Sequence, residues 1–172
     1  MAIRPILILP DPRLRKVAEP VAEIDDTIRA LSVDMLETMY DAPGIGLAAT
    51  QLGIMKRIFV MDCAPPDDPP QPMTIVNPEI LWTSEEPETS EEGCLSIPDV
   101  YEEVTRHERV RMRWLGLDGE THEQEFGDRW AVCIQHELDH LDGKLFIDYL
   151  GPVKRRMIVS KMKKLKKERG RA

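Results

Sequence analysis

The stretch Gln135-His136-Glu137-Leu138-Asp139-His140-Leu141 places two histidines four positions apart, with a glutamate directly after the first. In an α-helix of 3.6 residues per turn, His136 and His140 are separated by about 400° of rotation, so both imidazoles project from one face. Two imidazoles in that arrangement bind one metal ion, and the adjacent carboxylate accepts a proton from water that the metal activates. The pattern therefore predicts a hydrolytic metal site on a helix.

The residues around this stretch favour a buried helix. Asp128 is predicted to cap its N-terminus and Gly143 to end it. Between them an apolar stripe recurs at helical spacing, formed by Trp130, Cys133, Ile134, Leu138 and Leu141. Half of the four histidines of the chain fall within this one helix. The alternative, in which both are ordinary helix residues with hydrogen-bond partners, is the weaker interpretation.

The length of 172 residues predicts a single domain with a sizeable core. The apolar run at the N-terminus is too short for a signal peptide, and no segment approaches the length of a membrane span, so we expect a cytoplasmic protein. Cys63, Cys94 and Cys133 are an odd number of cysteines, far apart in the sequence. This argues for reduced thiols rather than a disulfide framework.

Charge is distributed unevenly along the chain. The net charge is −8, but residues 153–172 hold ten basic residues and one acidic residue, whereas the other 152 residues carry thirteen basic and thirty acidic ones. The acidic body argues against broad binding of nucleic acid by the catalytic part. The basic C-terminal segment, by contrast, suits a phosphate-rich surface.

The remaining patterns predict an α+β fold of mostly antiparallel sheets around the central metal-binding helix, with a C-terminal helix. Asp11-Pro12 opens a short helical turn, and Asp25 or Asp26 caps a longer helix with apolar residues at helical spacing. Two strands joined by a loop are predicted over Lys56–Asp62 and Met73–Trp82. A β-hairpin with its turn at Asp118-Gly119 is predicted from Val110 to Phe126. The C-terminal helix follows Pro152, at about 153–168.

A catalytic ion needs a third protein ligand besides the two histidines, with one position left for water. No histidine follows His140, and the nearby aspartates are too close in sequence, so a cysteine is the better candidate. Cys133 lies three residues before His136 on the same helical face, and Cys94 follows Gly93, which permits a tight turn and close backbone approach. We favour Cys94 because three ligands from consecutive turns of one helix would crowd one side of the ion; Cys133 is then a wall of the pocket.

If both cysteines bound the ion, the site would be a closed, structural zinc site. We regard this as the weaker alternative, because a closed site has no use for Glu137.

Three motifs of this chain resemble those of the peptide deformylase family. They are the glycine-rich segment Gly44-Ile45-Gly46-Leu47-Ala48-Ala49-Thr50-Gln51, the segment Glu92-Gly93-Cys94-Leu95-Ser96, and the helix with His136, Glu137 and His140. All three occur in the family's order, and the resemblance runs from Asp11-Pro12-Arg13-Leu14-Arg15 to the terminal helix. It implies one deformylase-like catalytic domain over residues 1–172.

The resemblance implies that Cys94, His136 and His140 bind one divalent metal ion, with Fe²⁺ expected in the cell and Zn²⁺, Ni²⁺ or Co²⁺ as alternatives. It implies removal of the formyl group from the N-terminal formylmethionine of nascent polypeptides, with release of formate. Glu137 would then transfer the proton, while the side-chain amide of Gln51 and the backbone N–H of Leu95 would stabilise the oxyanion. We expect the enzyme to be a monomer that acts on N-formylmethionyl nascent peptides and not on membranes.

Substrate contacts follow from the same resemblance. The methionine pocket is assigned to Ile45, Cys133 and the ring of His136, while Gly46 and Gly93 let the peptide backbone approach closely. Ile45 and Cys133 could equally be core residues. In some family members an arginine follows the second motif, where this chain reads Asp99-Val100-Tyr101-Glu102-Glu103. We therefore expect different contacts with the residues beyond methionine, and regard Arg106 as either a basic group near the groove or a surface arginine.

The last helix is predicted to be amphipathic and cationic, since Ile158, Met162 and Leu165 recur at helical spacing among lysines. We expect it to contact the ribosome, with a merely solvated helix end as the alternative. Two rival functions remain open at this point. One is a general metallopeptidase of the HExxH type, and the other is a binding module with a structural metal.

Overall fold

The computed structural model describes residues 2–170, which form an α+β fold with two sheets, as the sequence predicts. Every strand pair in the two sheets is antiparallel. A five-stranded sheet has the order β1-β2-β3-β6-β7 and a separate hairpin pairs β4 with β5. The strands are β1 (Gly46–Ala48), β2 (Ile58–Met61), β3 (Met73–Thr83), β4 (Pro87–Cys94), β5 (Ile97–His107), β6 (Val110–Leu115) and β7 (Thr121–Phe126). The helices are α1 (Asp26–Asp41), α2 (Asp128–Leu141) and α3 (Pro152–Gly170), with short 3₁₀ turns η1 (Pro12–Arg15), η2 (Ala49–Leu52) and η3 (Phe146–Tyr149).

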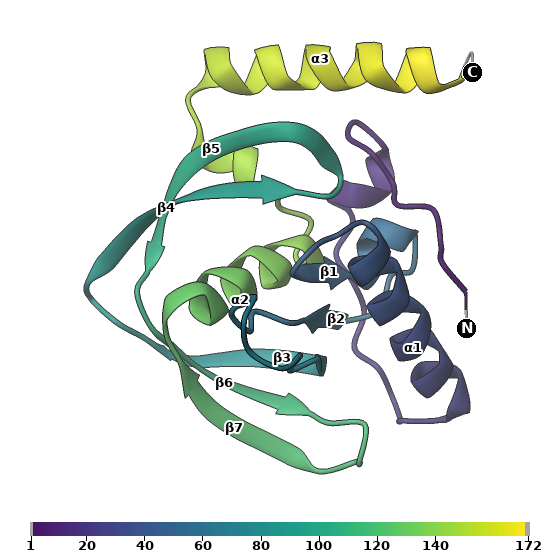
Figure 1. The fold of residues 1–172 in the computed structure, drawn as a ribbon, viewed down its shortest axis with the longest axis vertical. Coiled ribbons are helices and arrows are strands. Elements are labelled where there is room, and N and C mark those ends of the chain that lie inside the picture. Colours follow the sequence, from purple (N-terminus) through teal and green to yellow (C-terminus); the bar gives the residue numbers. More distant parts are fainter. Residues whose placement is uncertain (1, 171–172) are drawn as a thin grey trace.

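Helix α2 lies at the centre of the fold, between the five-stranded sheet on one side and the β4–β5 hairpin on the other (Figure 1). Its apolar stripe explains this position, because Ala131, Cys133, Ile134 and Leu141 are all buried against the core of the sheet. The opposite face of α2, with His136 and His140, turns toward the hairpin. The metal-site motif is therefore enclosed by both sheets.

The predicted helix ends are right for α1 and one residue off for α2. Asp25 caps α1 by accepting a hydrogen bond from the backbone N–H of Ile28. The N-cap of α2 is Gly127, and Asp128, the predicted cap, is instead the first helical residue, with a φ of 52°. Gly143 follows the C-terminus of α2 with a φ of 75°, a conformation in which glycine is favoured, as expected for a helix stop.

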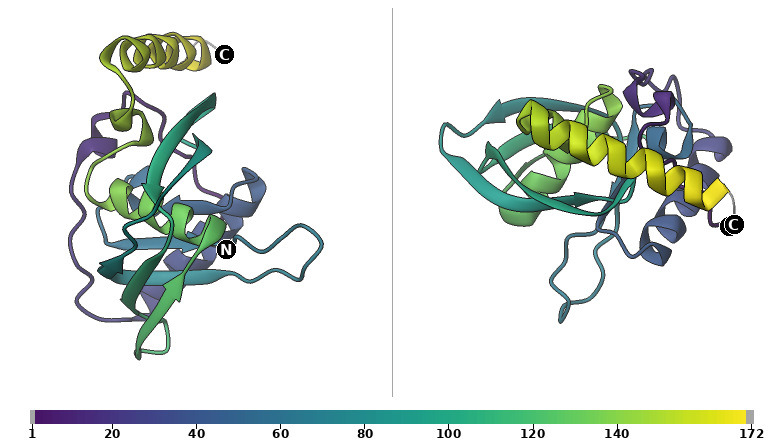
Figure 2. Two further views of the ribbon diagram at one scale, coloured as in Figure 1. Left: turned by 90° about the vertical axis from the view of Figure 1, so that its left-hand side faces the viewer. Right: turned by 90° about the horizontal axis from the view of Figure 1, so that it is seen from above.

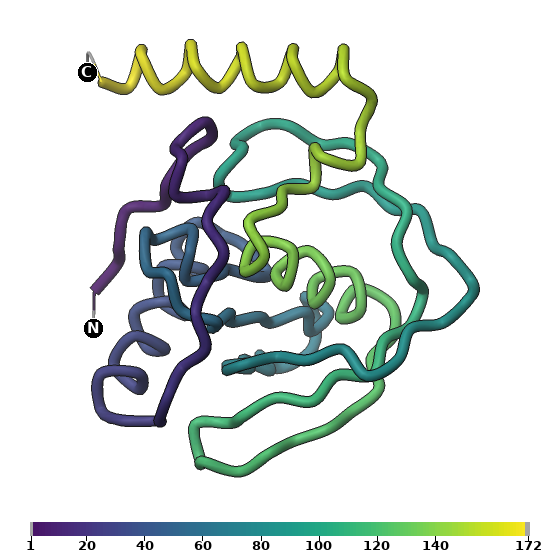
Figure 3. The backbone as a smooth tube through the Cα atoms, turned by 180° about the vertical axis from the view of Figure 1, so that it is seen from behind, coloured from purple at the N-terminus to yellow at the C-terminus, as the bar shows by residue number. Residues whose placement is uncertain are grey.

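The predicted strands β2 and β3 and the β6–β7 hairpin are confirmed, whereas β1 and the β4–β5 hairpin were not predicted. The loop between β2 and β3, which is rich in proline, projects from the body of the protein (Figure 2). On the far side, the segment before α1 runs along the back of the molecule (Figure 3). There the backbone N–H of Ala18 bonds to the carbonyl of Leu141 at 2.8 Å, which fixes the C-terminal end of α2.

Helix α3 crosses the β4–β5 hairpin on the outside of the molecule (Figure 1). Ile158 and Met162 are buried, and they share a cluster with Ile97, Val100 and Val104 of β5. The predicted C-terminal helix is thus confirmed, and it extends slightly beyond the predicted bounds. Within residues 2–170, none of the helices is long and apolar enough to cross a membrane.

Candidate metal centre

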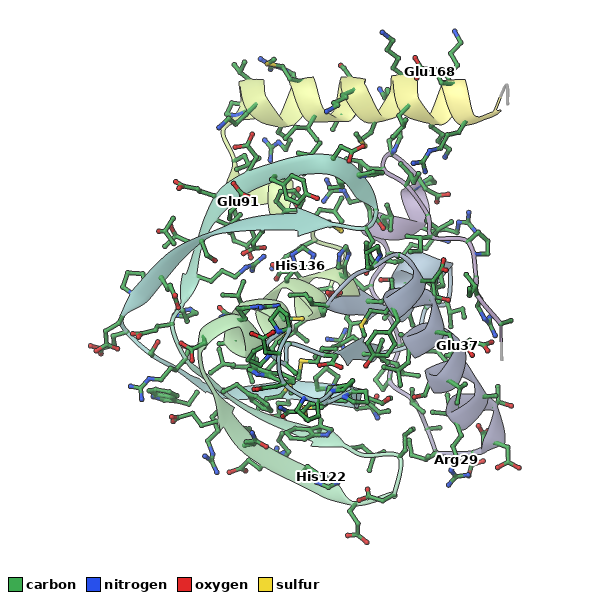
Figure 4. All side chains as sticks on the ribbon, viewed as in Figure 1. Arg29, Glu37, Glu91, His122, His136 and Glu168 are labelled. Atoms are coloured by element: carbon green, nitrogen blue, oxygen red, sulfur yellow. The ribbon has the colours of Figure 1, made fainter. Side chains whose placement is uncertain are left out.

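The side chains of Cys94, His136 and His140 meet between α2 and the turn of the β4–β5 hairpin. One ligand atom from each lies within 4.8 Å of the other two, and Cys94 Sγ is 3.3 Å from His140 Nε2. Both histidines are buried, with exposures of 8% and 1%. Figure 4 shows His136 in the interior, below the hairpin. In the sequence Cys94 lies 42 positions before His136, and the hairpin turn brings it back over the histidines.

Glu92 orients His136 from the strand that carries Cys94. The carboxylate of Glu92 accepts a hydrogen bond from His136 Nδ1 at 2.9 Å, so Nδ1 carries the hydrogen and the lone pair of Nε2 is available to a metal. Burial alone would raise the pKa of Glu92, but hydrogen bonds from His136 and Arg106 outweigh it and hold the pKa below its usual value. Glu92 is therefore an ionised acceptor that fixes the imidazole.

Arg106 completes this buried network. Its guanidinium donates two hydrogen bonds to Glu92, at 2.6 and 2.9 Å, and a third to Asp139 at 2.9 Å. Asp139 also accepts from the Tyr149 hydroxyl at 2.7 Å, and the guanidinium lies over the Tyr149 ring. The surface alternative for Arg106 is wrong; the side chain lies near the groove, bonded to Glu92 of its lining, but it does not line the groove itself. It is 7% exposed and fully paired with acidic residues.

Burial sets the protonation of the other two polar groups on α2. It lowers the pKa of His140 well below its ordinary value, with the charge of Arg106 acting in the same direction. His140 is thus a neutral imidazole, the form that binds metals. Burial raises the pKa of Glu137 to about 7, so this carboxyl exchanges a proton near neutral pH.

Three donors in this arrangement fit one divalent metal ion. A sulfur about 2.3 Å and an imidazole nitrogen about 2.0 Å from a tetrahedral ion lie roughly 3.5 Å apart, close to the observed 3.3 Å. Among the described residues, two buried side-chain atoms have no hydrogen-bond partner, and both belong to this helix: Glu137 Oε1 and His140 Nδ1. An unpaired carboxyl oxygen beside a thiolate and two imidazoles is the donor pattern of a metal-dependent hydrolase.

Cys133 lies near this group without joining it. Its thiol contacts the backbone carbonyl of Ile45 at 3.7 Å. A hydrogen bond with Cys63 and burial raise the pKa of Cys133 well above its usual value, so it remains a neutral thiol. The closed two-cysteine, two-histidine site considered from the sequence is therefore not supported.

Gln51 approaches the centre from η2. Its side-chain oxygen accepts a hydrogen bond from the backbone N–H of Ala48 at 2.9 Å, so the amide nitrogen must face the other way. That nitrogen donates to Ser96 Oγ at 3.0 Å and lies 3.6 Å from Cys94 Sγ. Gln51 and Leu95 both line the groove that opens onto the metal ligands.

The groove has a volume of about 780 Å³ and is lined by the four residues predicted to contact substrate, Ile45, Gly46, Gly93 and Cys133. Ile45 is 44% exposed, which removes the alternative of a core residue, whereas Cys133 is both in the core and on the groove wall. A Cβ atom on Gly46 would lie 2.6 Å from Glu137 Oε2 and 2.7 Å from Cys133 Sγ. Any side chain at position 46 would therefore displace Glu137.

Sequence reasoning missed the residues that support the ligands, which are Glu92, Ser96, Arg106, Asp139 and Tyr149. A signal for Glu92 existed, since it directly precedes Gly93-Cys94. Its partner Arg106 lies fourteen positions later, directly opposite Glu88 in the hairpin register, and no spacing rule identifies it before the hairpin is known.

Comparisons with known proteins agree with this geometry. The family model for polypeptide deformylase matches residues 3–156. Among similar sequences is a peptide deformylase of Phenylobacterium zucineum, 54% identical over 164 residues, which covers 95% of this chain and 97% of the relative. Another, from Alkalilimnicola ehrlichii, is 58% identical over 165 residues, covering 96% and 92%.

Solved structures give the same result. A peptide deformylase from Legionella pneumophila superposes with a TM-score of 0.91 at 44% identity, covering 99% of both chains. One from Ehrlichia chaffeensis, solved in complex with actinonin, has a TM-score of 0.92 at 38% identity, covering 95% of this chain and 98% of that one.

Proposed function

Since the chain belongs to the peptide deformylase family, we propose that Cys94, His136 and His140 hold one divalent metal ion and that Glu137 carries the proton of the reaction. The chain is a deformylase that removes the formyl group from the N-terminal formylmethionine of nascent polypeptides and releases formate. A general metallopeptidase and a binding module are not favoured, because the similarity to deformylases spans nearly the whole chain. The observation that carries the proposed site is the meeting of three ligand atoms within 4.8 Å beside the unpaired Glu137.

Each residue around the centre has a defined task in this proposal. Cys94, His136 and His140 would hold the ion, which would supply a Lewis acid that lowers the pKa of water toward roughly 7 and polarises the formyl group. Glu137, with a pKa of about 7, takes a proton from the attacking water at its carboxyl oxygen and returns it to the departing amine. A Cβ atom at position 46 would lie 2.6 Å from Glu137 Oε2, so Gly46 leaves the space that this carboxyl occupies beside the groove.

Two donors are proposed to stabilise the oxyanion that forms during attack. The first is Gln51 Nε2, whose direction is fixed by the Ala48 N–H bond on the oxygen side of the amide. The second is the backbone N–H of Leu95, next to the metal ligand Cys94. Loss of one such donor typically lowers kcat by about 10² to 10³.

Substrate backbone is proposed to lie between β1 and β4. β1 ends the five-stranded sheet and β4 pairs with β5 alone, so each has one unpaired edge, and both strands line the groove. An extended peptide can use such edges through main-chain hydrogen bonds. Gly46 and Gly93 would allow close backbone approach there, with the methionine side chain against Ile45, Cys133 and the ring of His136.

The metal, the assembly and the location are further parts of the proposal. Fe²⁺ is proposed as the metal in the cell; Zn²⁺, Ni²⁺ and Co²⁺ suit the same thiolate and imidazole donors. We propose that residues 1–172 form one catalytic domain that acts as a monomer in the cytoplasm, where nascent chains are made. The packing of α3 residues against β5 supports the inclusion of α3 in that domain.

Helix α3 is proposed to contact ribosomal RNA through its outer face. Lys164 and Lys167 are exposed there, on the side opposite the buried Met162. We expect Lys164→Glu/Lys167→Glu to weaken salt-sensitive co-sedimentation with ribosomes, whereas the same change at the exposed lysines Lys56 and Lys144 outside α3 should leave it intact. Equal binding by both double variants would contradict the contact. Deletion of residues 160–172 is a poorer test, because it also removes the buried Met162.

The function itself is tested by release of formate. With formyl-Met-Ala-Ser the metal-loaded protein should release one formate per peptide, and with acetyl-Met-Ala-Ser it should release no acetate. Glu137→Gln should keep the metal and lose at least about 10³-fold in kcat, whereas Glu120→Gln, at an exposed position, should behave as the wild type. Cleavage of internal peptide bonds without release of formate would overturn the proposal.

A further inference from the structure

The outer part of the groove contains an aromatic side chain to which the proposed mechanism gives no task. Tyr101 on β5 is 64% exposed, which is unusual for a tyrosine, yet it lines the same groove as the metal ligands. Large exposed aromatic side chains at the rim of a binding groove are typical contact residues.

The position of the Tyr101 ring is fixed by its neighbour across the hairpin. A Cβ atom on Gly93 would lie 2.6 Å from Cε1 and 2.8 Å from Cδ1 of Tyr101, so the ring lies directly over the backbone of Gly93. Gly93 precedes the metal ligand Cys94. The ring is therefore held close to the centre, on the strand along which an extended peptide is proposed to run.

Carboxylates lie on the same rim. Glu91 and Asp99 are both exposed and line the groove, and within residues 2–170 neither forms an ion pair. Figure 4 shows Glu91 on the hairpin, away from the buried His136. Asp41, Glu88 and Asp128 also line the groove. The outer groove thus offers an aromatic face and several negative charges.

Three arginines line the groove as well, and they do not cancel this charge. Arg4 is already paired with Asp34 at 2.8 Å, which leaves Arg129 and Arg169 against five carboxylates outside the catalytic centre. That this groove receives a ligand is supported independently by Glu137, which lines it and whose Oε1 is buried and has no hydrogen-bond partner.

We propose that Tyr101 is a specificity-determining residue that, together with Glu91 and Asp99, selects a lysine or arginine in the two residues that follow formylmethionine. A cation over the tyrosine face is attracted by the ring, and the flanking carboxylates add to the attraction while repelling acidic side chains. Because Gly93 directly precedes the ligand Cys94, a peptide that runs from the centre along β4 passes Gly93 with the residues just after formylmethionine. The inference rests on the proposed function.

Five formyl peptides test the preference on the metal-loaded enzyme. Formyl-Met-Ala-Ser is the reference, and lysine or glutamate replaces either the alanine or the serine. We expect kcat/KM to be about tenfold higher for the better lysine peptide than for the glutamate peptide at the same position, mainly through KM. The ratio should fall at 0.5 M salt, because exposed charges are screened.

Variants separate the contribution of the Tyr101 ring from that of the Glu91 and Asp99 carboxylates. Tyr101→Leu should lower the lysine-to-glutamate ratio about threefold, whereas Tyr101→Phe, which keeps the ring face, should retain it. Glu91→Gln combined with Asp99→Asn should lower the ratio by a similar factor. Asparagine tolerates the φ of 60° at position 99, so this change is compatible with the backbone. Glu103→Gln, at an exposed position of β5 away from the groove lining, is the matched charge control.

The outcomes distinguish failure of the specificity inference from failure of the proposed function. If formyl-Met-Ala-Ser is turned over but the lysine and glutamate peptides differ by less than twofold, the specificity inference is wrong and the function stands. If Tyr101→Leu and Tyr101→Phe lower the ratio equally, the ring face is not the contact. Failure to release formate from any of the five peptides overturns the proposed function itself.

Discussion

Helices α2 and α3 are of similar length but are held in place by opposite means. In α2, seven of fourteen residues are buried, and the network of Glu92, Arg106 and Asp139 fixes the ring of His136 from the neighbouring strand. Of the nineteen residues that the structure describes in α3, two are buried and nine are lysine or arginine. The difference indicates that α2 provides accurate geometry for chemistry, whereas α3 provides charge, for which accurate placement matters less.

The largest effect is expected where the α2 network is broken. Arg106→Met leaves the carboxylates of Glu92 and Asp139 without their buried cation, so we expect the free energy of unfolding to fall by about 3–5 kcal/mol. Metal affinity should fall about 10- to 100-fold, since Glu92 would no longer fix His136. Urea unfolding and competition with a chelator measure the two effects. Arg111→Met, which breaks the exposed pair with Glu123, should cost under about 1 kcal/mol.

A smaller effect is expected where α3 attaches to the body. Met162 is fully buried, so Met162→Ala should lower the free energy of unfolding by about 2–3 kcal/mol, while Met157→Ala, at an exposed site on the same helix, should have little effect. Thermal unfolding of both variants checks this. A similar loss in the two variants would show that α3 does not pack on β5 as described.

The contact between α3 and η1 should contribute still less to the free energy of unfolding, and this contribution should depend on pH. A hydrogen bond from Arg13, the largest cause, lowers the pKa of Asp11 to about 2, and Lys166 of α3 lies 3.9 Å from the same carboxylate. Because the folded-state pKa is depressed, the stabilisation is present above about pH 4 and is lost as the pH falls toward 2. Asp11→Asn, which removes the charge paired with Arg13, should cost up to about 1 kcal/mol at pH 7, and the difference from the wild type should shrink toward pH 2 in urea titrations.

The smallest effect on stability is expected on the outer face of α3. Lys164→Glu/Lys167→Glu should change the free energy of unfolding by less than about 0.5 kcal/mol, because neither side chain is buried. A large loss of stability in this double variant would mean that the outer face packs against part of the protein.

The same contrast explains what the sequence could predict. The α2 motif predicts its own helix and two ligands because the 3.6-residue period places His136 and His140 together without reference to any other element. The third ligand, Cys94, could be favoured from Gly93 and from the crowding expected of Cys133.

The residues that hold the metal ligands in place were harder to predict from the sequence. The β4–β5 hairpin was not predicted, since β4 is polar and carries five acidic or hydroxyl side chains in a row, from Glu88 to Glu92. Without that hairpin, Arg106 could not be paired with Glu92, and its place was left open between the edge of the groove and the surface. Asp128 was misassigned as the cap of α2 because a side chain suited to capping stood one residue after the actual N-cap, Gly127.

Anomalous diffraction from crystals loaded with one divalent metal tests the central claim most directly. The account predicts one peak per chain, at about 2.3 Å from Cys94 Sγ and about 2.0–2.1 Å from a ring nitrogen of His136 and of His140, with no other protein atom in contact. A peak bound by Cys133 in place of Cys94, or one enclosed by four protein ligands, would contradict it.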